Sequence, residues 1–365
     1  AVLGIEMSGP GALTHTANAI FRCDGLEQLH TKAPGYRYIL IGPEGTWATL
    51  VAINGRDQWR FSLIGDGRQR DVRTEEMRQA IVRAVGRDFE FEILSIMPWV
   101  RQQLVADAYR KGRAFLAGDA AHLTSPTGGF GMNTGILDAV NLSWKLTARI
   151  QGWGGEALLD SYETEQRPVA VRNVTEAGDN LKRMLEPRLA QPDPALFGDD
   201  ATSETQDARS KFGDHYTEMM KREWHSTGIH LGYVYDGSPV IVPDGTPVPD
   251  MRVPQFAQTA RPGSRAPHIW LGESHSILDE FDAGFTLLRF GDSDTASLRA
   301  AADRLGVPAR EVLIDNAAAA RLYERTLVLV RPDGQVCWRG DTPPEDPDSL
   351  IARLTGQHLP APAMG

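Results

Sequence analysis

The first hundred residues carry the apolar pattern of an antiparallel sheet. β-branched and aromatic runs predict strands at residues 19–23, 36–41, 47–53, 58–64 and 89–99. Asn54-Gly55 is a strong hairpin signal between two of them, because both residues tolerate positive φ. Apolar residues at helical spacing predict a helix over residues 74–85, with Gly86 as its stop.

A strand, a glycine-rich loop and two helices are predicted next. A short strand at residues 114–117 leads through the loop into a long helix that continues to about residue 150. A second helical pattern covers residues 158–185, where Pro168 predicts a kink or break. Residues 187–207 are polar and rich in Pro and Asp, and this composition predicts a loop.

The last hundred residues form a separate α/β pattern, which begins after a boundary at Arg261-Pro262-Gly263. Its expected order is strand, helix, three strands and helix, over residues 285–290, 296–305, 312–314, 326–330, 335–339 and 347–354. Such an order over about 95 residues makes a self-contained unit.

Composition narrows the class of protein. The 365 residues include 48 acidic and 38 basic side chains, for a net charge of −10, which argues against a nucleic-acid partner. No apolar run approaches the roughly 20 residues of a membrane-spanning helix. Cys23 and Cys337 form no disulfide framework and no CxxC motif, and the nine histidines lack metal-site spacing, so we expect a cytoplasmic protein without a metal.

Candidate chemistry lies where the short strand ends and the long helix begins. Asp119 follows the strand, where a carboxylate suits a grip on sugar or ribityl hydroxyls. Glycines at 128, 129 and 131 permit close backbone approach to a flat or anionic ligand, and the helix N-terminus offers unpaired N–H groups. An ordinary glycine-rich turn is the alternative, because Thr134 replaces the third glycine of the nucleotide fingerprint.

The long helix carries a polar stripe. Asp138, Asn141 and Lys145 lie at positions i, i+3 and i+7, so their side chains share one side. The stripe either supports a ligand site or is a solvated face, and periodicity does not separate the two.

In fixed order, these segments resemble a known family. The resemblance is to the GD-motif region of class A flavoprotein monooxygenases, the single-component aromatic hydroxylases. It rests on residues 113–122 with Gly118-Asp119, on Ser125-Pro126, on 129–135, on 138–146 and on 159–170. Residues 261–268, 284–288 and 329–339 resemble the thioredoxin-like domain that ends the phenol- and polyketide-hydroxylase branch. The resemblance covers nearly the whole chain.

The resemblance implies an FAD site. Asp119 would hold the ribityl or ribose hydroxyls, the loop through Pro126 would pass the reactive face of the flavin, and backbone N–H groups of the first helical turn would bind the pyrimidine edge. The implied cofactor-binding residues are Gly118, Asp119, Pro126, Gly129, Gly131, Met132 and Asn133.

The implied reaction is hydroxylation of a phenolic or polycyclic aromatic substrate through a flavin C4a-hydroperoxide, with NADPH or NADH as electron donor and O₂ as co-substrate. The family's sheet floors the substrate pocket, so Tyr38, Trp47 and Pro126 are expected to contact substrate. For the sheet aromatics, ordinary packing is the alternative. No catalytic base follows from the sequence, and a homodimer is the family-based expectation.

The expected fold class is α+β and α/β. Residues 1–105 form an antiparallel or mixed substrate-binding sheet, and 106–185 form the C-terminal part of an FAD-binding, Rossmann-like domain of the GR2 type. Residues 186–260 connect this part to a thioredoxin-like domain at 261–365. Without CxxC, that last domain is expected to serve packing or dimer contact.

The chain departs from the family in lacking both the Gly-x-Gly-x-x-Gly motif and a second Asp-Gly motif. We therefore weigh a second hypothesis, a catalytically incomplete piece of such an enzyme that acts as a binding or assembly module. A flavin-dependent halogenase or dehydrogenase with the same fold is a third. Flavin content and NAD(P)H-dependent O₂ uptake separate these hypotheses.

Overall fold

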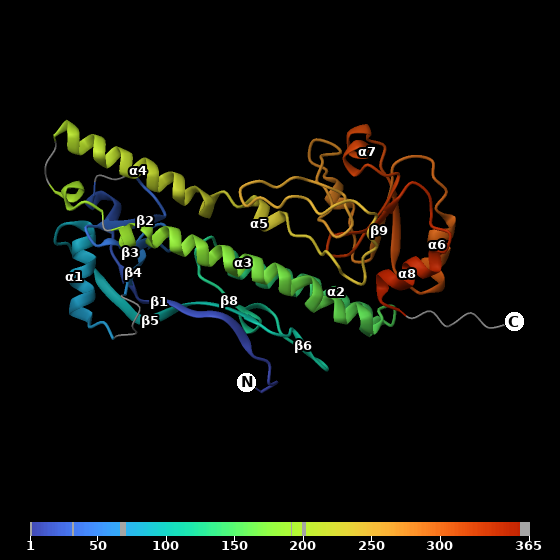
Figure 1. Cartoon of the computed structure of the whole chain (residues 1–365), viewed down its shortest axis with the longest axis horizontal. Coiled ribbons are helices and arrows are strands. Elements are labelled where there is room, and N and C mark those ends of the chain that lie inside the picture. The colour runs from blue at the N-terminus through green and yellow to red at the C-terminus, as the bar shows by residue number, and fades with distance from the viewer. Residues whose placement is uncertain (1, 31–32, 66–70, 191, 199–201, 358–365) are drawn as a thin grey trace.

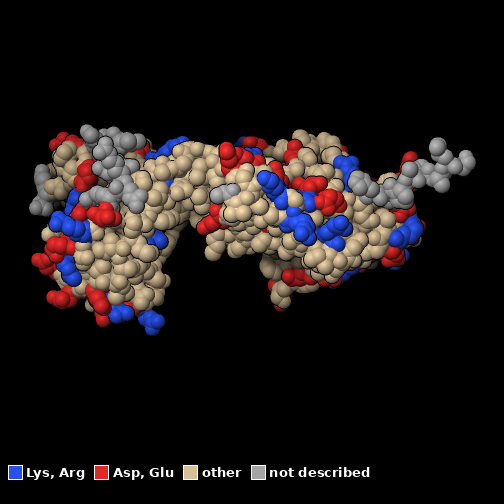
Figure 2. Space-filling model, turned by 90° about the horizontal axis from the view of Figure 1, so that it is seen from below, with Lys and Arg blue, Asp and Glu red and all other residues tan. Residues whose placement is uncertain are grey.

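The computed structural model describes residues 2–30, 33–65, 71–190, 192–198 and 202–357. A sheet with helix α1 lies at one end, helices α2 and α3 run through the middle, and an α/β unit lies at the other end (Figure 1). The face seen in Figure 2 is hollowed between the two ends, and both ends carry interspersed charges of both signs.

The large sheet has six strands in the order β2-β3-β4-β1-β5-β8. Their bounds are Met7–Arg22 (β1), Arg37–Gly42 (β2), Gly45–Ala52 (β3), Gln58–Ile64 (β4), Glu92–Ala106 (β5) and His122–Leu123 (β8). Helix α1, Thr74–Val85, buries Met77 and Ile81 against one face of this sheet. The five predicted strands and the predicted helix are confirmed, and all pairings between these strands are antiparallel.

Strand β1 is much longer than its sequence suggests. It begins at Met7, although the glycines and proline of residues 9–11 disfavour a strand. Pairing with β5 supplies the missing stabilisation, and register shifts between Ser8 and Gly11 and between Ala12 and Thr14 accommodate these residues as bulges.

The helices in the middle of the chain differ from the sequence prediction in two places, at Pro168 and in the predicted loop at residues 187–207. Helix α2 spans Phe130–Gln151 and α3 spans Glu156–Ala190, so α3 continues through Pro168 and no break occurs there. Proline removes one helical hydrogen bond, yet α3 stays helical there and packs along α2 (Figure 1). Helix α4, Ser203–Trp224, begins inside the stretch predicted as a loop.

Short elements complete the part of the chain before the C-terminal unit: β6 (Arg110–Lys111), β7 (Ala114–Phe115), α5 (Thr227–Leu231) and the 3₁₀ turns at Leu26–Leu29, Gly118–Ala120 and Pro194–Phe197.

The C-terminal unit is built on a mixed sheet in the order β10-β9-β11-β12. Its elements are a 3₁₀ turn at Ile277–Glu280, β9 (Phe285–Arg289), α6 (Ala296–Arg304), β10 (Ala309–Leu313), α7 (Ala317–Tyr323), β11 (Leu327–Val330), β12 (Val336–Gly340) and α8 (Pro347–Thr355). Strands β9 and β10 are parallel, and the other pairs are antiparallel. The predicted order is confirmed except for α7, an alanine-rich helix that Asn316 caps through its side chain.

The C-terminal unit shares a hydrophobic core with the middle helices. Trp144 of α2 and Trp153 pack on Phe285 of β9, with ring centroids 6.1 and 6.2 Å away. Backbones also meet closely there, because a Cβ on Gly155 would lie 1.8 Å from the carbonyl oxygen of Gly356. The two ends of the molecule are therefore joined through α2 and α3. Within the described part of the chain, no helix is long and apolar enough to cross a membrane.

Candidate functional site

Two cavities adjoin where the large sheet meets the start of α2. The first, here called the helix groove, has a volume of about 600 Å³ and is lined by Asp119 and the first turn of α2. The second, here called the sheet pocket, has a volume of about 390 Å³ and lies over the strands. Trp99, Pro126 and Gly129 line both cavities, so a ligand in one would lie directly beside a ligand in the other.

The loop before α2 leaves the end of this helix open to the groove. Gly128 and Gly129 have φ values of 94° and 69°, in the left-handed region that favours glycine. No side chain caps the helix, so its first N–H groups are available to a ligand. A Cβ on Gly131 would lie 2.7 Å from Cγ2 of Thr124, which shows how tightly the loop packs.

Asp119 lies in the 3₁₀ turn Gly118–Ala120, which a hydrogen bond to α2 holds in place. One oxygen of buried Asp138, on α2, accepts from the backbone N–H of Gly118 at 2.8 Å and contacts Nε2 of buried His122 at 2.9 Å. These contacts hold the turn against the helix. The carboxylate of Asp119 itself is exposed and has no polar partner among the described residues.

The structure brings five of the seven expected cofactor-binding residues to the helix groove: Asp119, Pro126, Gly129, Gly131 and Met132. Gly118 lies behind Asp119, and the side chain of Asn133 donates to the carbonyl of Gly129 at 2.9 Å. A free carboxylate suits the hydroxyls of a ribityl chain, and uncapped N–H groups with the helix dipole suit an electron-rich ring edge. The residues present therefore fit a flavin.

The sheet pocket is built on the face of the sheet that α1 does not cover. Arg37, Val51 and Arg60 are cross-strand neighbours on β2, β3 and β4, so their side chains share that face. Side chains alternate along a strand, and Tyr38 and Trp47 consequently pack with the α1 core on the opposite face. The structure does not bring these two expected residues to the pocket, whereas Pro126 does line it.

Three guanidinium groups line the sheet pocket: Arg37, Arg60 and Arg101, here called the arginine cluster. Arg101, on β5, is only 5% exposed; its Nη1 donates to Oγ1 of Thr14 at 3.3 Å, and its Nε has no hydrogen-bond partner in the described structure. Burial, together with the positive charges of Arg37 and Arg60, lowers the pKa of Arg101 to about 10.

One carboxylate accompanies these cations. Oε1 of buried Glu223, at the end of α4, accepts from Nη1 of Arg37 at 2.7 Å and from the N–H of Gly128 at 3.2 Å. Its Oε2 has no partner among the described residues. Tyr36 and Trp224 meet edge to face at 5.9 Å and add an aromatic wall. Glu223 thus joins α4, the glycine loop and the arginine cluster.

The sequence pointed to the groove but not to Arg60, Arg101 or Glu223. The groove residues are close together in the chain and formed a motif, whereas the cluster comes from three separate strands and Glu223 from an unpredicted helix. One signal was present: Arg60 sits between the buried Trp59 and Phe61, so a charged position alternates with core positions.

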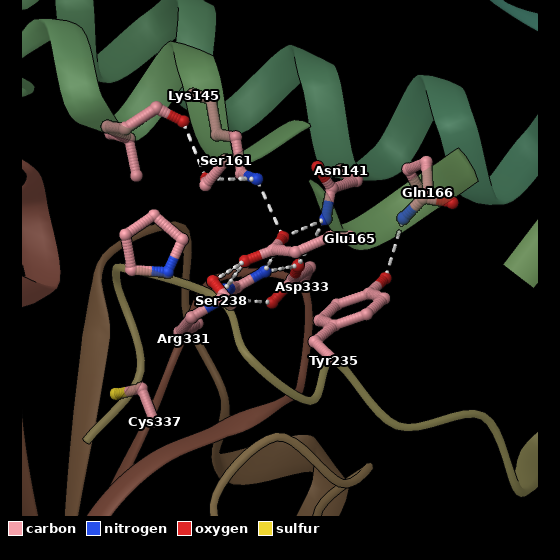
Figure 3. Close-up of polar contacts among 12 residues, drawn as sticks. Asn141, Lys145, Ser161, Glu165, Gln166, Tyr235, Ser238, Arg331, Asp333 and Cys337 are labelled. Carbon is pink, nitrogen blue, oxygen red and sulfur yellow. Dashed lines mark hydrogen bonds and ion pairs between the residues drawn. The ribbon is translucent and has the colours of Figure 1, made fainter. Parts of the chain in front are cut away.

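A second group of charges, here called the junction cluster, is buried between the middle helices and the C-terminal unit (Figure 3). Glu165 of α3 lies at its centre. Its carboxylate receives Nη1 and Nη2 of Arg331 at 2.6 and 2.9 Å and Nζ of Lys145 at 2.6 Å. Asp333 accepts from Nε of Arg331 at 3.0 Å. Asn141 and Ser238 donate to Glu165 at 2.7 and 2.6 Å.

This cluster decides the nature of the polar stripe on α2. Asp138, Asn141 and Lys145 are at most 1% exposed, so the stripe is not a solvated face. Its members bond to other protein groups, and none lines the helix groove or the sheet pocket. Burial raises the pKa of Glu165, but Arg331 and Lys145 outweigh it and hold this pKa well below its usual range. Burial lowers the pKa of Lys145 to about 8.

Comparisons with known proteins decide the family. Residues 1–177 match the model of an FAD binding domain, and residues 259–357 match the C-terminal domain of aromatic-ring hydroxylases. A putative polyketide hydroxylase of Streptomyces coelicolor is 32% identical over 98% of this chain and 68% of its own length. The chain belongs to the FAD-dependent aromatic-ring hydroxylases.

Another relative and two solved structures are also similar to this chain along nearly its whole length. A putative polyketide hydroxylase of Streptomyces halstedii is 35% identical over 93% of the chain, which spans 62% of that relative's length. The solved structure of RebC with bound 7-carboxy-K252c superposes with a TM-score of 0.88 at 36% identity, over 98% of this chain and 66% of RebC. Aklavinone-11 hydroxylase in complex with FAD and aklavinone gives a TM-score of 0.76 at 28% identity, over 98% of this chain and 65% of that one.

Proposed function

We propose that this chain carries the substrate pocket and the flavin-ring site of an FAD-dependent monooxygenase that hydroxylates a phenolic or polycyclic aromatic compound. One observation carries the proposal: the sheet pocket and the helix groove share Trp99, Pro126 and Gly129. An aromatic ring in the pocket would therefore lie against a flavin in the groove. The named relatives support the substrate class, since they include polyketide hydroxylases and a complex with aklavinone.

Each part of the groove has a proposed role. The Asp119 carboxylate accepts hydrogen bonds from ribityl hydroxyls, and the N–H groups of Gly131, Met132 and Asn133 donate to the pyrimidine edge of the flavin ring. When bound, FAD supplies oxygen activation, with O₂ as co-substrate and electrons from NADPH or NADH. The protein orients the substrate ring, and Pro126 and Trp99, which line both cavities, lie where the substrate and the flavin would meet.

Several expectations extend this proposal and stay predictions. They are the four-part division at residues 105, 185 and 260, a homodimer, and a cytoplasmic location. Two buried free thiols, Cys23 and Cys337, are compatible with a reducing compartment.

Flavin binding tests the proposal most directly. The desalted protein is examined by visible absorption, titrated with FAD, and then assayed for aromatic-stimulated NAD(P)H oxidation and a hydroxylated product. We expect Asp119→Ala to weaken FAD binding about tenfold, because hydrogen bonds to a charged acceptor are lost. Asp107→Ala is the matched control: it removes another exposed aspartate, one that lines neither cavity, and FAD affinity should not change.

The outcomes separate the residue's role from the function. Unchanged FAD affinity in Asp119→Ala contradicts the role of Asp119 alone. A protein that neither contains nor takes up FAD, and oxidises no NAD(P)H with aromatic compounds present, contradicts the monooxygenase function itself.

A further inference from the structure

The charges around the sheet pocket do not balance. Three guanidinium groups line it, and Glu223 is its one carboxylate among the described residues. The other titratable groups there are uncharged at neutral pH, since burial lowers the pKa of His230 and raises that of Tyr36. Among the three arginines, Glu223 pairs only with Arg37, and no carboxylate of the described residues lies within ion-pair distance of Arg60 or Arg101. The pocket therefore carries three positive charges against one negative charge.

Arg101 is the member of the arginine cluster that lies most deeply buried. A buried charge without a partner costs free energy, and proteins normally pair it or move it to the surface. Arg101 is instead 95% buried beneath the pocket, makes one hydrogen bond to a neutral hydroxyl and has an unpartnered Nε. A donor held in this way is suited to an acceptor that arrives with a ligand.

We propose that the arginine cluster binds a carboxylate group of the substrate, so that the preferred substrates are planar aromatic acids. The inference rests on the proposed function and makes its substrate class more specific. Guanidinium groups match the planar, two-oxygen geometry of a carboxylate.

The rest of the pocket suits such a molecule. Trp99 is 39% exposed and Trp224 is 51% exposed, so aromatic faces are available for stacking next to the cations. The free Oε2 of Glu223 can accept from a ring hydroxyl or N–H. The acid would thus be held by its carboxylate over the sheet, with its ring extending toward Pro126 and the groove.

A pair of nearly isosteric probes tests the proposal. Purified protein in the presence of FAD is titrated by calorimetry at pH 7.5 with 3-hydroxy-2-naphthoate and with its neutral carboxamide. We expect the acid to bind at least tenfold more tightly, because a charge-assisted contact replaces a neutral one. Arg101→Met should reduce this preference to about twofold or less while the carboxamide affinity stays the same.

Two further variants keep the test decisive. Arg60→Gln changes an exposed residue at the pocket rim, so folding should not suffer, and it should reduce the preference several-fold. Arg22→Gln removes another exposed arginine of the same sheet, which pairs with Asp57 and Glu92 away from the pocket, and should leave both affinities unchanged.

Equal binding of acid and amide to the unaltered protein overturns the proposal, even if both compounds stimulate NAD(P)H oxidation and the monooxygenase function stands. A preference that survives in both Arg101→Met and Arg60→Gln also overturns it. Conversely, tight, arginine-dependent binding of the acid without any hydroxylation supports the carboxylate site and contradicts the proposed function.

Discussion

The molecule holds two groups of charges, one buried at the junction and one lining the sheet pocket, and they are arranged in opposite ways. In the junction cluster, Lys145 and Arg331 face Glu165 and Asp333, so two cations meet two anions through short hydrogen bonds. In the sheet pocket, three arginines face Glu223, the one carboxylate among the described residues that line it. The junction cluster is complete without a ligand, and the arginine cluster is not.

This difference separates two uses of buried charge. A balanced network joins elements that are distant in sequence, here α2, α3 and the turn between β11 and β12, and it specifies how the C-terminal unit docks. An unbalanced network makes the empty pocket less stable than it could be, and a ligand of the missing charge relieves that cost. Stability measurements on matched variants can therefore distinguish the two clusters.

The largest effect is expected from Glu165→Gln in the junction cluster. The change leaves Lys145 and Arg331 buried with Asp333 as their remaining anion, so we expect a loss of about 3–5 kcal/mol in unfolding free energy. Urea unfolding followed by circular dichroism measures it. The control is Glu92→Gln, which breaks an exposed pair with Arg22 and should cost under about 1 kcal/mol. Equal losses in the two variants would mean that the junction cluster contributes no more than a surface ion pair.

The next largest effect is expected on lowering the pH. The difference in unfolding free energy between the unaltered protein and Glu165→Gln should become smaller. The pKa of Glu165 is depressed in the folded state, so its stabilising contribution is complete above the unfolded pKa of about 4.3 and is lost progressively as pH falls below it. Unfolding free energies at pH 7, 5, 4 and 3 measure the difference, in which other carboxylates common to both proteins cancel. A difference that stays constant down to pH 3 would contradict the depressed pKa.

The two clusters also show what the sequence could predict. The strands and helix of the large sheet follow from local periodicity, and the groove from residues adjacent in the chain, so both were predictable. The start of β1 and the continuation of α3 through Pro168 depend on pairing and packing with other elements, which local propensity does not contain.

Charge balance is likewise not a local property. Lys145 was visible in the sequence as part of a polar stripe, but its partner Glu165 is 20 positions away, and Arg331, the other cation on Glu165, is 166 positions beyond Glu165. The arginine cluster combines β2, β4 and β5 in the same way. The family resemblance suggested that the sheet aromatics contact substrate, yet it did not decide which face Tyr38 and Trp47 would occupy. The packing of α1 decides it.

The smallest expected change in unfolding free energy comes from Arg101→Met. It is compared with Arg331→Met, the same substitution at a buried arginine of the junction cluster, where we expect the opposite sign. Arg101→Met replaces a charge that lacks a counter-charge with an apolar side chain of similar length, and it loses one hydrogen bond to Thr14. We expect unfolding free energy to rise by about 1 kcal/mol. Arg331→Met, in contrast, leaves Glu165 and Asp333 with Lys145 as their only cation and should lower unfolding free energy. Urea midpoints with unchanged slopes measure both. If Arg101→Met destabilises the protein as strongly as Arg331→Met does, the buried charge of the pocket serves the fold and is not held for a ligand.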